Sequence, residues 1–318
     1  MAGRGGQVHV YAIGMRTRFR GITVREGMLF DGPAGWGDFC PFADYDDAAS
    51  LPWLRAAEEA ATLGWPDPVR DSIAVNCTVP AVGPDAAAAI VHGSAGCRTA
   101  KVKVAEAGQS DDDDVARVEA VADALGPGGR VRIDANGGWD VDHAVAMIRR
   151  LDRVGLEYVE QPCATIEELA AVRRRVDVPI AADESIRRSE DPLRVARRHA
   201  ADIAVLKVAP LGGVHACLAI AEQIGLPVVV SSAVETSVGI AAGLALAAAL
   251  PALPYACGLA TVALLDRDVV ERPLLPVDGA IAVRRPHPDP GLLAAAAADP
   301  VRRAAWLQRY DAVAGRTA

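Results

Sequence analysis

The sequence contains very little lysine. Only three of its 33 lysine and arginine residues are lysine, namely Lys101, Lys103 and Lys207. Arginine keeps its proton in proteins and cannot serve as a base, whereas a buried lysine changes its pKa readily. A chain that uses arginine nearly everywhere else therefore indicates that these three positions need an amine.

The chain also lacks the features of several protein classes. Its formal net charge is −8 and its arginines are scattered without an aromatic-interleaved basic patch, so we expect no nucleic-acid partner. The six cysteines lie far apart, with no C-x-x-C or metal-ligand spacing, which predicts reduced thiols. Because the first residues also lack the apolar core of a signal peptide, we predict a cytoplasmic protein.

The longest uncharged stretch, Val238 to Leu265, exceeds the length of a membrane span. It is rich in alanine and is interrupted by Pro251 and Pro254, which favours a buried helix followed by a strand. We therefore expect no membrane association. Alanine-rich helices pack inside a domain as readily as between subunits, so the sequence leaves the oligomeric state open, with a monomer as our prediction.

Residues 1–72 are predicted to form an α+β unit. Apolar and polar residues alternate over 7–31, which predicts a small antiparallel meander. Two loops are expected in this unit, a basic one at 14–21 and one at 35–42 that is rich in glycine and aromatic residues. Two helical segments are expected within 46–64.

From Ser72 the pattern becomes a repeat of short apolar runs and helix-like segments. The runs recur roughly every 23 to 32 residues, the size of a βα unit, and predict a parallel barrel of the (β/α)8 kind over 73–265. A doubly wound sheet is the alternative, but its usual glycine-rich phosphate loop is not present. The tail, 266–318, is expected to pack back on the N-terminal unit. The eight predicted strands cover 73–79, 99–104, 131–136, 156–161, 180–184, 203–208, 228–232 and 255–259, and the helices cover 115–125, 141–153, 166–176, 192–200, 215–224 and 237–250.

Three acidic residues end three successive predicted strands. They are Asp134 in Asp-Ala-Asn, Glu160 in Glu-Gln-Pro and Asp183 in Asp-Glu-Ser. Each alone could cap a helix or form a salt bridge, but in a barrel the strand ends meet at one face, where active sites lie. Carboxylates that close repel unless a charge neutralises them, and three oxygen ligands with room for water describe a Mg²⁺ site, with Mn²⁺ as the alternative ion.

The lysines end two other predicted strands. Lys101 and Lys103 are two residues apart and project to the same face, where the repulsion of two ammonium groups lowers the pKa of at least one. Lys207 ends the sixth strand, across the barrel. A solvated strand edge is the alternative meaning of Lys-x-Lys. A metal beside a carboxylate substrate, with an amine on each face, is suited to removing the proton α to that carboxylate.

Taken together, Lys-x-Lys, Asp-Ala-Asn, Glu-Gln-Pro, Asp-Glu-Ser and the strand-six lysine resemble the muconate-lactonizing subgroup of the enolase superfamily. The resemblance implies a modified TIM barrel, (β/α)7β, with an α+β capping domain built from the N-terminal segment and the C-terminal tail. It implies that Asp134, Glu160 and Asp183 bind Mg²⁺. It also implies that Lys103 is the acid/base, that Lys207 faces it, and that Lys101 lowers the pKa of Lys103 and touches the metal-bound carboxylate.

A narrower resemblance rests on residues 230–237, residues 255–261 and the short loop at 14–21. It implies a hydro-lyase of menaquinone biosynthesis that dehydrates a cyclohexadiene carboxylate bearing a hydroxyl and a succinyl side chain. Lys103 would take the α-proton and protonate the departing hydroxyl, while Lys207 would stabilise the enediolate. The substrate would be held by Ser231, Ser232, backbone amides near Gly258, and Arg132 acting through water.

Other functions remain open. An N-succinylamino acid racemase or a dipeptide epimerase would use the same lysine pair, although residues 257–260 lack the acidic pair that epimerases usually carry there. The longer capping loop of muconate cycloisomerase is absent. From another class, Lys207 could form a Schiff base in a metal-free lyase. A non-catalytic binding protein gives no reason to retain both lysine clusters and all three acids.

Overall fold

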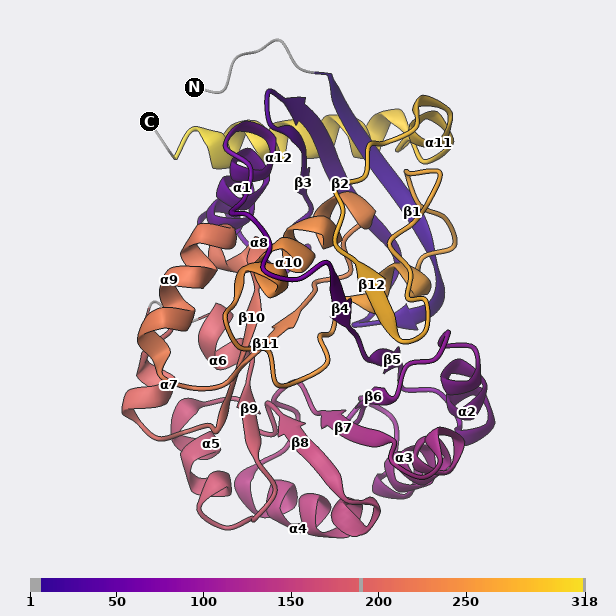
Figure 1. Cartoon of the computed structure of the whole chain (residues 1–318), viewed down its shortest axis with the longest axis vertical. Coiled ribbons are helices and arrows are strands. Elements are labelled where there is room, and N and C mark those ends of the chain that lie inside the picture. Colours follow the sequence, from indigo (N-terminus) through magenta and orange to yellow (C-terminus); the bar gives the residue numbers. More distant parts are fainter. Residues whose placement is uncertain (1–6, 189–190, 317–318) are drawn as a thin grey trace.

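The computed structural model describes residues 7–188 and 191–316. Its centre is a seven-stranded parallel sheet whose order in space follows the order in sequence, from β5 to β11 (Figure 1). This arrangement places the carboxyl ends of all seven strands at one face and confirms the predicted barrel repeat. The strands are β5 (Cys77–Val79), β6 (Thr99–Lys103), β7 (Arg130–Asp134), β8 (Leu156–Glu160), β9 (Ile180–Ala182), β10 (Ile203–Lys207) and β11 (Val228–Ser231).

The eighth predicted strand is reduced to two bridge residues. Cys257 pairs in parallel with Val75, before β5, and Gly258 pairs in parallel with Ser231 of β11. The amide of Gly258 donates to the carbonyl of Val230 at 2.8 Å. These two bridges join the first and last strands of the sheet, so the curled sheet closes as a modified TIM barrel.

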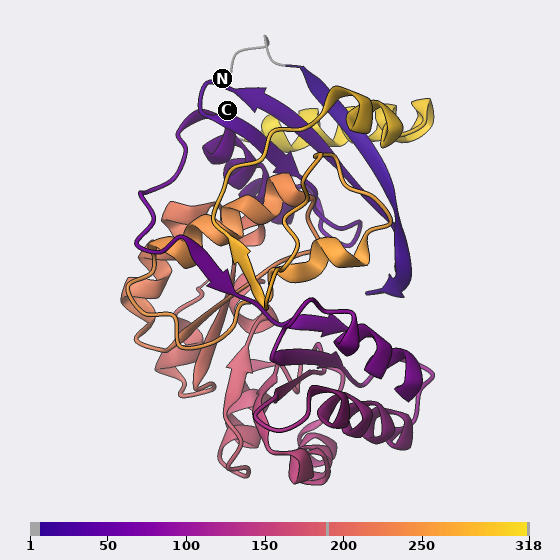
Figure 2. The same cartoon turned by 45° about the vertical axis from the view of Figure 1, so that its right-hand side comes forward.

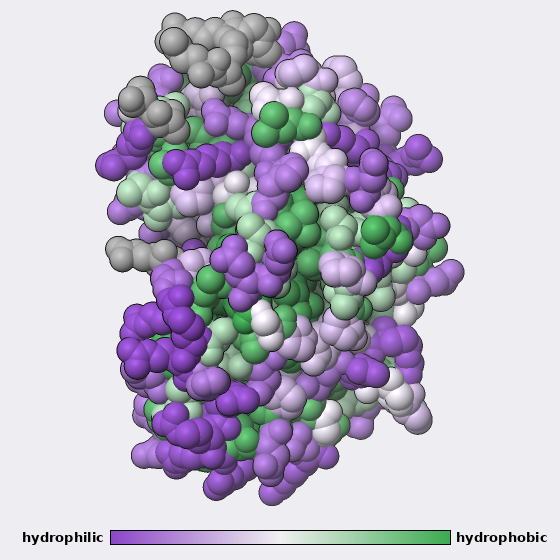
Figure 3. Space-filling view, turned by 60° about the vertical axis from the view of Figure 1, so that its left-hand side comes forward, coloured by the Kyte–Doolittle hydropathy of each residue, from purple (hydrophilic) through white to green (hydrophobic). Residues whose placement is uncertain are grey.

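Helices cover the outside of the barrel (Figure 1), and hydrophilic side chains cover most of the face seen in Figure 3, with apolar ones gathered near its centre. The predicted helix at 192–200 is shorter than expected because His199 adopts a left-handed backbone conformation. No helix in the described ranges is long and apolar enough to span a membrane. The elements are α2 (Pro84–His92), α3 (Asp111–Leu125), α4 (Val141–Leu151), η1 (Asp152–Val154), α5 (Ile166–Arg173), α6 (Glu184–Arg187), α7 (Arg194–Arg197), α8 (Val208–Leu211), α9 (Val214–Ile224), α10 (Ser237–Ala249) and η2 (Ala260–Leu264).

The N-terminal segment folds into a separate antiparallel sheet above the barrel (Figure 2). Two of the expectations for this segment were wrong. Residues 14–21 are not a loop, because β1 continues to Phe19 and turns into β2 through Arg20 and Gly21, whose positive φ angles suit a two-residue hairpin. Residues 35–42 begin with a strand, β3. The strands are β1 (Val8–Phe19), β2 (Ile22–Gly32) and β3 (Gly35–Phe39).

A single helix, α1 (Asp47–Thr62), replaces the two helical segments expected within 46–64. The side chain of Asp46 caps its first turn, and the helix continues through Pro52. Trp53 and Leu54, directly after this proline, are fully buried in the core beneath the capping sheet. Burial of one continuous apolar face thus keeps the helix in one piece.

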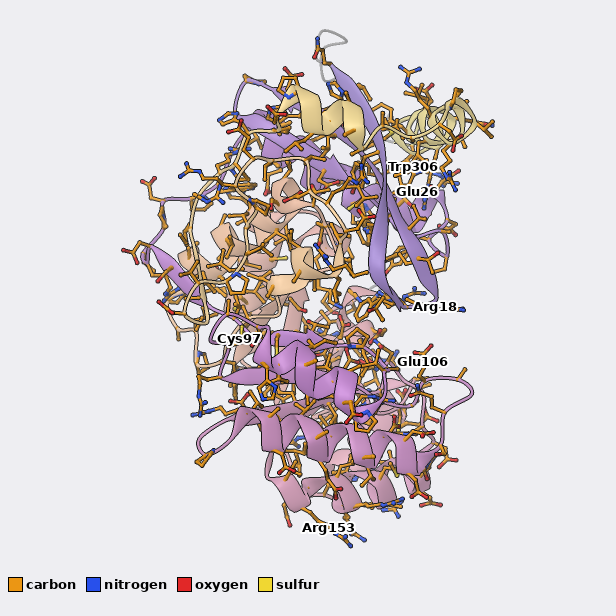
Figure 4. The ribbon with its side chains drawn as sticks, turned by 90° about the vertical axis from the view of Figure 1, so that its right-hand side faces the viewer. Arg18, Glu26, Cys97, Glu106, Arg153 and Trp306 are labelled. Atoms are coloured by element: carbon orange, nitrogen blue, oxygen red, sulfur yellow. The ribbon has the colours of Figure 1, made fainter. Side chains whose placement is uncertain are left out.

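The C-terminal segment contacts both parts of the molecule. Its strand β12 (Ala280–Ala282) pairs antiparallel with β4 (Ser72–Ala74), and its helices α11 (Pro290–Ala295) and α12 (Pro300–Ala314) run along the capping sheet (Figure 1). Trp306 of α12 donates from Nε1 to Glu26 of β2 at 3.0 Å (Figure 4). The division of the chain at residues 72 and 265 stays a prediction.

A buried carboxylate of the capping helix binds the start of a barrel helix. Glu59 of α1 accepts hydrogen bonds from the backbone N–H of Val214 at 2.6 Å and from the ring Nδ1 of His215 at 3.0 Å. The N-cap residue of helix α9 is Gly213, which has no side chain that could cap the helix. Glu59 therefore supplies the missing cap from another part of the chain.

We expect Glu59→Gln to lower the free energy of unfolding by about 2 kcal/mol, because the amide replaces a charged acceptor at a helix N-terminus and leaves buried N–H groups poorly paired. Urea unfolding followed by circular dichroism measures this change. Glu58→Gln, one residue earlier on the same helix, is the matched control and should change stability by less than about 0.5 kcal/mol. Equal losses in the two variants would contradict the capping role.

Candidate active site

The two lysines of β6 lie buried at the barrel mouth. Their strand is in register with β7, so that Lys103 lies beside Asp134. The Nζ of Lys103 donates to Asp134 Oδ2 at 2.5 Å and to Asn136 Oδ1 at 2.6 Å. The Nζ of Lys101 donates to both oxygens of Glu160, at 2.8 and 3.0 Å. The structure thus rules out a solvated strand edge for this pair.

The three strand-end acids lie together, as the sequence predicted. Asp134 and Glu160 are register partners on adjacent strands, and Asp183 follows the end of the next strand, β9. All three side chains are fully buried. Lys101 also lies 3.3 Å from Asp134, and Lys207 donates to Asp183 Oδ2 at 2.6 Å. Three carboxylates and three lysines therefore form one buried cluster.

Burial and mutual repulsion set the protonation of this cluster. Burial and the nearby Asp134 raise the pKa of Glu160 to about 7. Burial acts against the ionised form of Asp183 too, but Arg187 and Lys207 lower its pKa on balance. Burial lowers the pKa of Lys207.

The expected effect of like charge is wrong for Lys101. Burial acts to lower the pKa of this amine, but Glu160 and Asp134 offset that cost and the pKa is raised on balance. The ammonium therefore serves to neutralise the two acids.

A small cavity lies above this cluster and beneath the β1–β2 hairpin. The hairpin tip reaches down to the barrel mouth, beside the labelled Arg18 in Figure 4. The Nζ of Lys103 lies 5.3 Å from the centroid of the Phe19 ring. The lining residues are Phe19, Arg20, Thr78, Lys101, Lys103, Asn136, Lys207, Ser231, Ser232, Ala233, Val234, Gly258 and Thr261. Both lysine groups thus face the same enclosed space.

Comparison with known proteins identifies the family. The family described as "Enolase C-terminal domain-like" matches residues 85–296, and "Enolase N-terminal domain-like" matches residues 10–61. A protein named o-succinylbenzoate synthase from Thermobifida fusca (strain YX) is 68% identical over 302 residues, which cover 95% of this chain and 94% of the relative. The chain belongs to the o-succinylbenzoate synthase family of the enolase superfamily.

Other members agree with this assignment. A second o-succinylbenzoate synthase, from Mycolicibacterium smegmatis, is 58% identical over 307 residues, covering 96% of this chain and 94% of the relative. Among solved structures, the L-Ala-D/L-Glu epimerase from Bacillus subtilis has a TM-score of 0.77 at 23% identity, covering 91% of this chain and 98% of that chain. Muconate cycloisomerase from Pseudomonas fluorescens has a TM-score of 0.76 at 22% identity, covering 92% and 98%. These two structures show the shared fold.

The donor atoms of the site suit the metal that the superfamily uses. Within the described ranges, no three His, Cys, Asp or Glu side chains are arranged to hold a metal ion as they stand. Lysines neutralise Asp134, Glu160 and Asp183 instead. Three buried carboxylates nevertheless offer only hard oxygen donors, which fit Mg²⁺ or Mn²⁺, and superfamily sites combine a lysine base with Mg²⁺. Metal binding by these three residues stays our proposal.

The structure allows the positions of the predicted substrate-binding residues to be compared with the cavity. Ser231, Ser232 and Gly258 all line the cavity. The amide of Gly258 itself donates to the carbonyl of Val230 in the closing bridge, and binding of a carboxylate by backbone amides near Gly258 stays a prediction. The hydroxyl of Ser232 donates to the carbonyl of Gly258 at 2.7 Å. A Cβ at Gly258 would lie 2.6 Å from Ser231 Oγ, so a larger residue here would displace the Ser231 hydroxyl.

Arg132, which was predicted to act through water, is not among the residues that line this cavity. It lies two residues before Asp134, one layer deeper in the barrel. Its Nη1 donates to the carbonyl of Ala256 at 2.7 Å, and its guanidinium stacks 4.6 Å from the ring centroid of Tyr158. Arg132 therefore holds the reduced eighth strand in place, and its role toward the substrate through water stays a prediction.

Several site residues were missed by the sequence analysis. Arg187 donates from Nε to Asp183 Oδ1 at 2.9 Å and from Nη2 to Glu184 Oε1 at 2.6 Å, and it also contacts the hydroxyl of Tyr45 in the capping segment. The cavity residues Phe19, Arg20, Thr78, Asn136 and Thr261 were missed as well. The basic run at 14–21 and the Asn of Asp-Ala-Asn were the available signals.

A buried ion pair on α3 supports the end of β6. Arg117 donates from Nη1 to the carbonyl of Lys103 at 2.8 Å and to Asp114 Oδ1 at 2.7 Å. The other oxygen of Asp114 accepts the amide of Ala105 at 2.8 Å, where the backbone has φ of 58°. The pair thus fixes the unusual turn directly after Lys103.

We expect Arg117→Lys to lower the free energy of unfolding by about 2 to 3 kcal/mol, because an ammonium cannot reach all of these buried acceptors. We also expect the turnover number to fall several-fold as the end of β6 loosens. Thermal unfolding and steady-state assays measure the two effects. The exposed Arg149→Lys on α4 is the control, and an effect equal to the control would contradict this role.

Proposed function

We propose that this chain dehydrates 2-succinyl-6-hydroxy-2,4-cyclohexadiene-1-carboxylate to o-succinylbenzoate, a step of menaquinone biosynthesis. One observation carries the proposal: Lys101 and Lys103 on the second barrel strand and Lys207 on the sixth line one buried cavity beside three converging acids. Relatives named o-succinylbenzoate synthase at 68% and 58% identity support it.

Lys103 acts as base and then as acid. Its neutral amine takes the proton α to the substrate carboxylate, and the resulting ammonium gives that proton to the departing ring hydroxyl on the same face. One C–H and one C–O bond break, water leaves, and the ring gains its third double bond. Asn136, which bonds Lys103 at 2.6 Å, holds the amine in place for both transfers.

Charge develops on the substrate carboxylate when the proton leaves. Asp134, Glu160 and Asp183 would hold Mg²⁺, and the bound ion would supply positive charge to stabilise this carboxylate. Lys207 faces the ring from the opposite side and stabilises the same enediolate as a cation. Lys101 favours the ionised form of Glu160 through its hydrogen bonds of 2.8 and 3.0 Å and so opposes the effect of burial on this acid.

The substrate side chain requires its own polar partners. Thr78 Oγ1 is buried in the cavity wall and has no hydrogen-bond partner among the described residues. Arg20 reaches the same cavity from the hairpin tip, and Ser231 lies on β11. We assign these three residues to the succinyl group, because an unpaired buried hydroxyl and a guanidinium suit a carboxylate and a keto oxygen.

Ultraviolet absorbance of the purified protein with this substrate and Mg²⁺, with and without EDTA, tests the proposal. We expect rapid aromatisation that EDTA abolishes. If the substrate is unchanged while Mg²⁺ still binds, a panel of N-succinylamino acids and dipeptides tests the racemase and epimerase alternatives. EDTA-insensitive activity, with borohydride trapping of substrate on Lys207, would establish the Schiff-base lyase instead.

A further inference from the structure

One wall of the cavity is a strained loop. Residues 232–236 connect β11 to α10, and within them Ala233 and Val234 line the cavity. Val234 has φ of 63°, a left-handed conformation that a β-branched residue rarely adopts. Such strain persists only where the surroundings hold the backbone in place, so other groups must fix Val234.

A single guanidinium from the capping sheet holds this loop. Arg25 lies on β2 and is only 2% exposed. Its Nε donates to the carbonyl of Val234 at 3.0 Å, and its Nη2 donates to the carbonyls of Ala233 at 3.1 Å and Cys40 at 2.5 Å. Two consecutive carbonyls of the strained turn are therefore fixed by one planar group.

Two buried acids complete the clamp. Glu235 Oε2 accepts the amide of Ala233 at 2.7 Å. Asp38 of β3 accepts the amide of Thr236 at 3.2 Å and its hydroxyl at 2.8 Å. Both acids lie near Arg25 and compensate its buried charge. The loop is thus held from the capping sheet at its middle and at its end.

We propose that Arg25 is a positioning residue for substrate binding: it keeps Val234 in the left-handed conformation and so sets the cavity wall against the succinyl side chain. The inference rests on the proposed function. Arg25 also lies on the hairpin whose tip carries Phe19 and Arg20, so one side chain fixes the wall and the cover of the same cavity.

The competing interpretation is that Arg25 only stabilises the fold. The two interpretations differ in kinetics, because a loose wall weakens substrate binding while Lys103, on the far strand β6, keeps its geometry. They differ also in the response to Val234→Gly. Glycine adopts positive φ freely, so it should keep the loop conformation when Arg25 no longer enforces it.

The experiment compares wild type, R25K, V234G and R25K/V234G. Lysine keeps the buried charge but cannot bond both carbonyls as the planar fork does. We expect R25K to raise KM about tenfold, which corresponds to about 1.4 kcal/mol, with kcat within about twofold. Calorimetric titration should show the same loss of affinity for o-succinylbenzoate. V234G removes a side chain from the cavity wall and is therefore the reference for the double variant: adding R25K to V234G should change KM little, because glycine keeps the loop conformation without Arg25.

The matched control is R70K. Arg70 also binds carbonyls, those of Ala247 and Leu250, but at the opposite end of α10. R70K should lower thermal stability without changing KM. If R25K does not fold, the comparison of R25K/V234G with V234G decides the question, since an equal KM supports the proposal and a KM about tenfold higher in the double variant overturns it.

Two outcomes separate the inference from the proposed function. If wild type does not aromatise the substrate, the proposed function fails. If wild type is active but R25K loses only stability, or if R25K raises KM as much in V234G as in wild type, the positioning role of Arg25 is overturned while the proposed function stands.

Discussion

Lys103→Arg is expected to lose about 10³-fold or more in turnover while remaining folded. The guanidinium keeps the positive charge next to Asp134, which the ammonium now neutralises at 2.5 Å, so the buried cluster stays balanced. Arginine cannot give up that charge, however, and therefore cannot take the α-proton. Aromatisation followed by ultraviolet absorbance measures the loss, and exchange of the substrate α-proton in deuterium oxide should stop as well.

The control for this variant tests the opposite exchange at a neighbouring site. Arg98, just before β6, donates to the carbonyls of Leu125 and Pro127 on the barrel exterior, and Arg98→Lys should retain nearly full turnover. Thermal unfolding confirms that both variants are folded. Turnover by Lys103→Arg within tenfold of wild type would remove Lys103 from the role of base.

Asp183→Asn is expected to weaken Mg²⁺ binding by about 100-fold or more, because an amide is a poorer and uncharged ligand at the same place. The structure also predicts that this variant is less stable than wild type, which the sequence did not indicate. Asp183 also accepts hydrogen bonds from Lys207 at 2.6 Å and Arg187 at 2.9 Å, and neutral asparagine leaves these buried cations poorly compensated. Calorimetric titration with Mg²⁺ measures the affinity.

Glu184→Gln separates the two effects. Glu184 is the next residue and binds the same Arg187 at 2.6 Å, but it is not among the three proposed ligands. This variant should share part of the stability loss and keep its Mg²⁺ affinity. If both variants bind Mg²⁺ equally well, the three-strand metal site is wrong.

The sequence predicted the part of the site that the strand repeat encodes. Lys103 and the three acids end their strands or directly follow them, and parallel strands bring such positions together without further information. Level along the strand does not decide which residue reaches the cavity: Arg132 pairs in register with Lys101, which lines the cavity, but Arg132 is bound to the carbonyl of Ala256.

What the sequence could not supply were contacts between distant segments. Tyr45 reaches Arg187 and Arg25 reaches Val234 only because the capping sheet sits on the barrel mouth. No periodic pattern in a sequence predicts a contact between distant segments. The sequence also does not indicate which of its many arginines are buried. The hairpin at 14–21 was also missed, because the basic residues there were interpreted as a loop.

The scarcity of lysine has a practical consequence. The three lysines are 6%, 8% and 5% exposed, so reagents that acylate amines find no lysine side chain on the outer surface of this protein. Any lysine that does react must belong to the cavity, and Phe19 covers Lys103 there. The rate of lysine acylation, read by mass spectrometry, therefore measures how accessible this cavity is, with no label introduced by engineering.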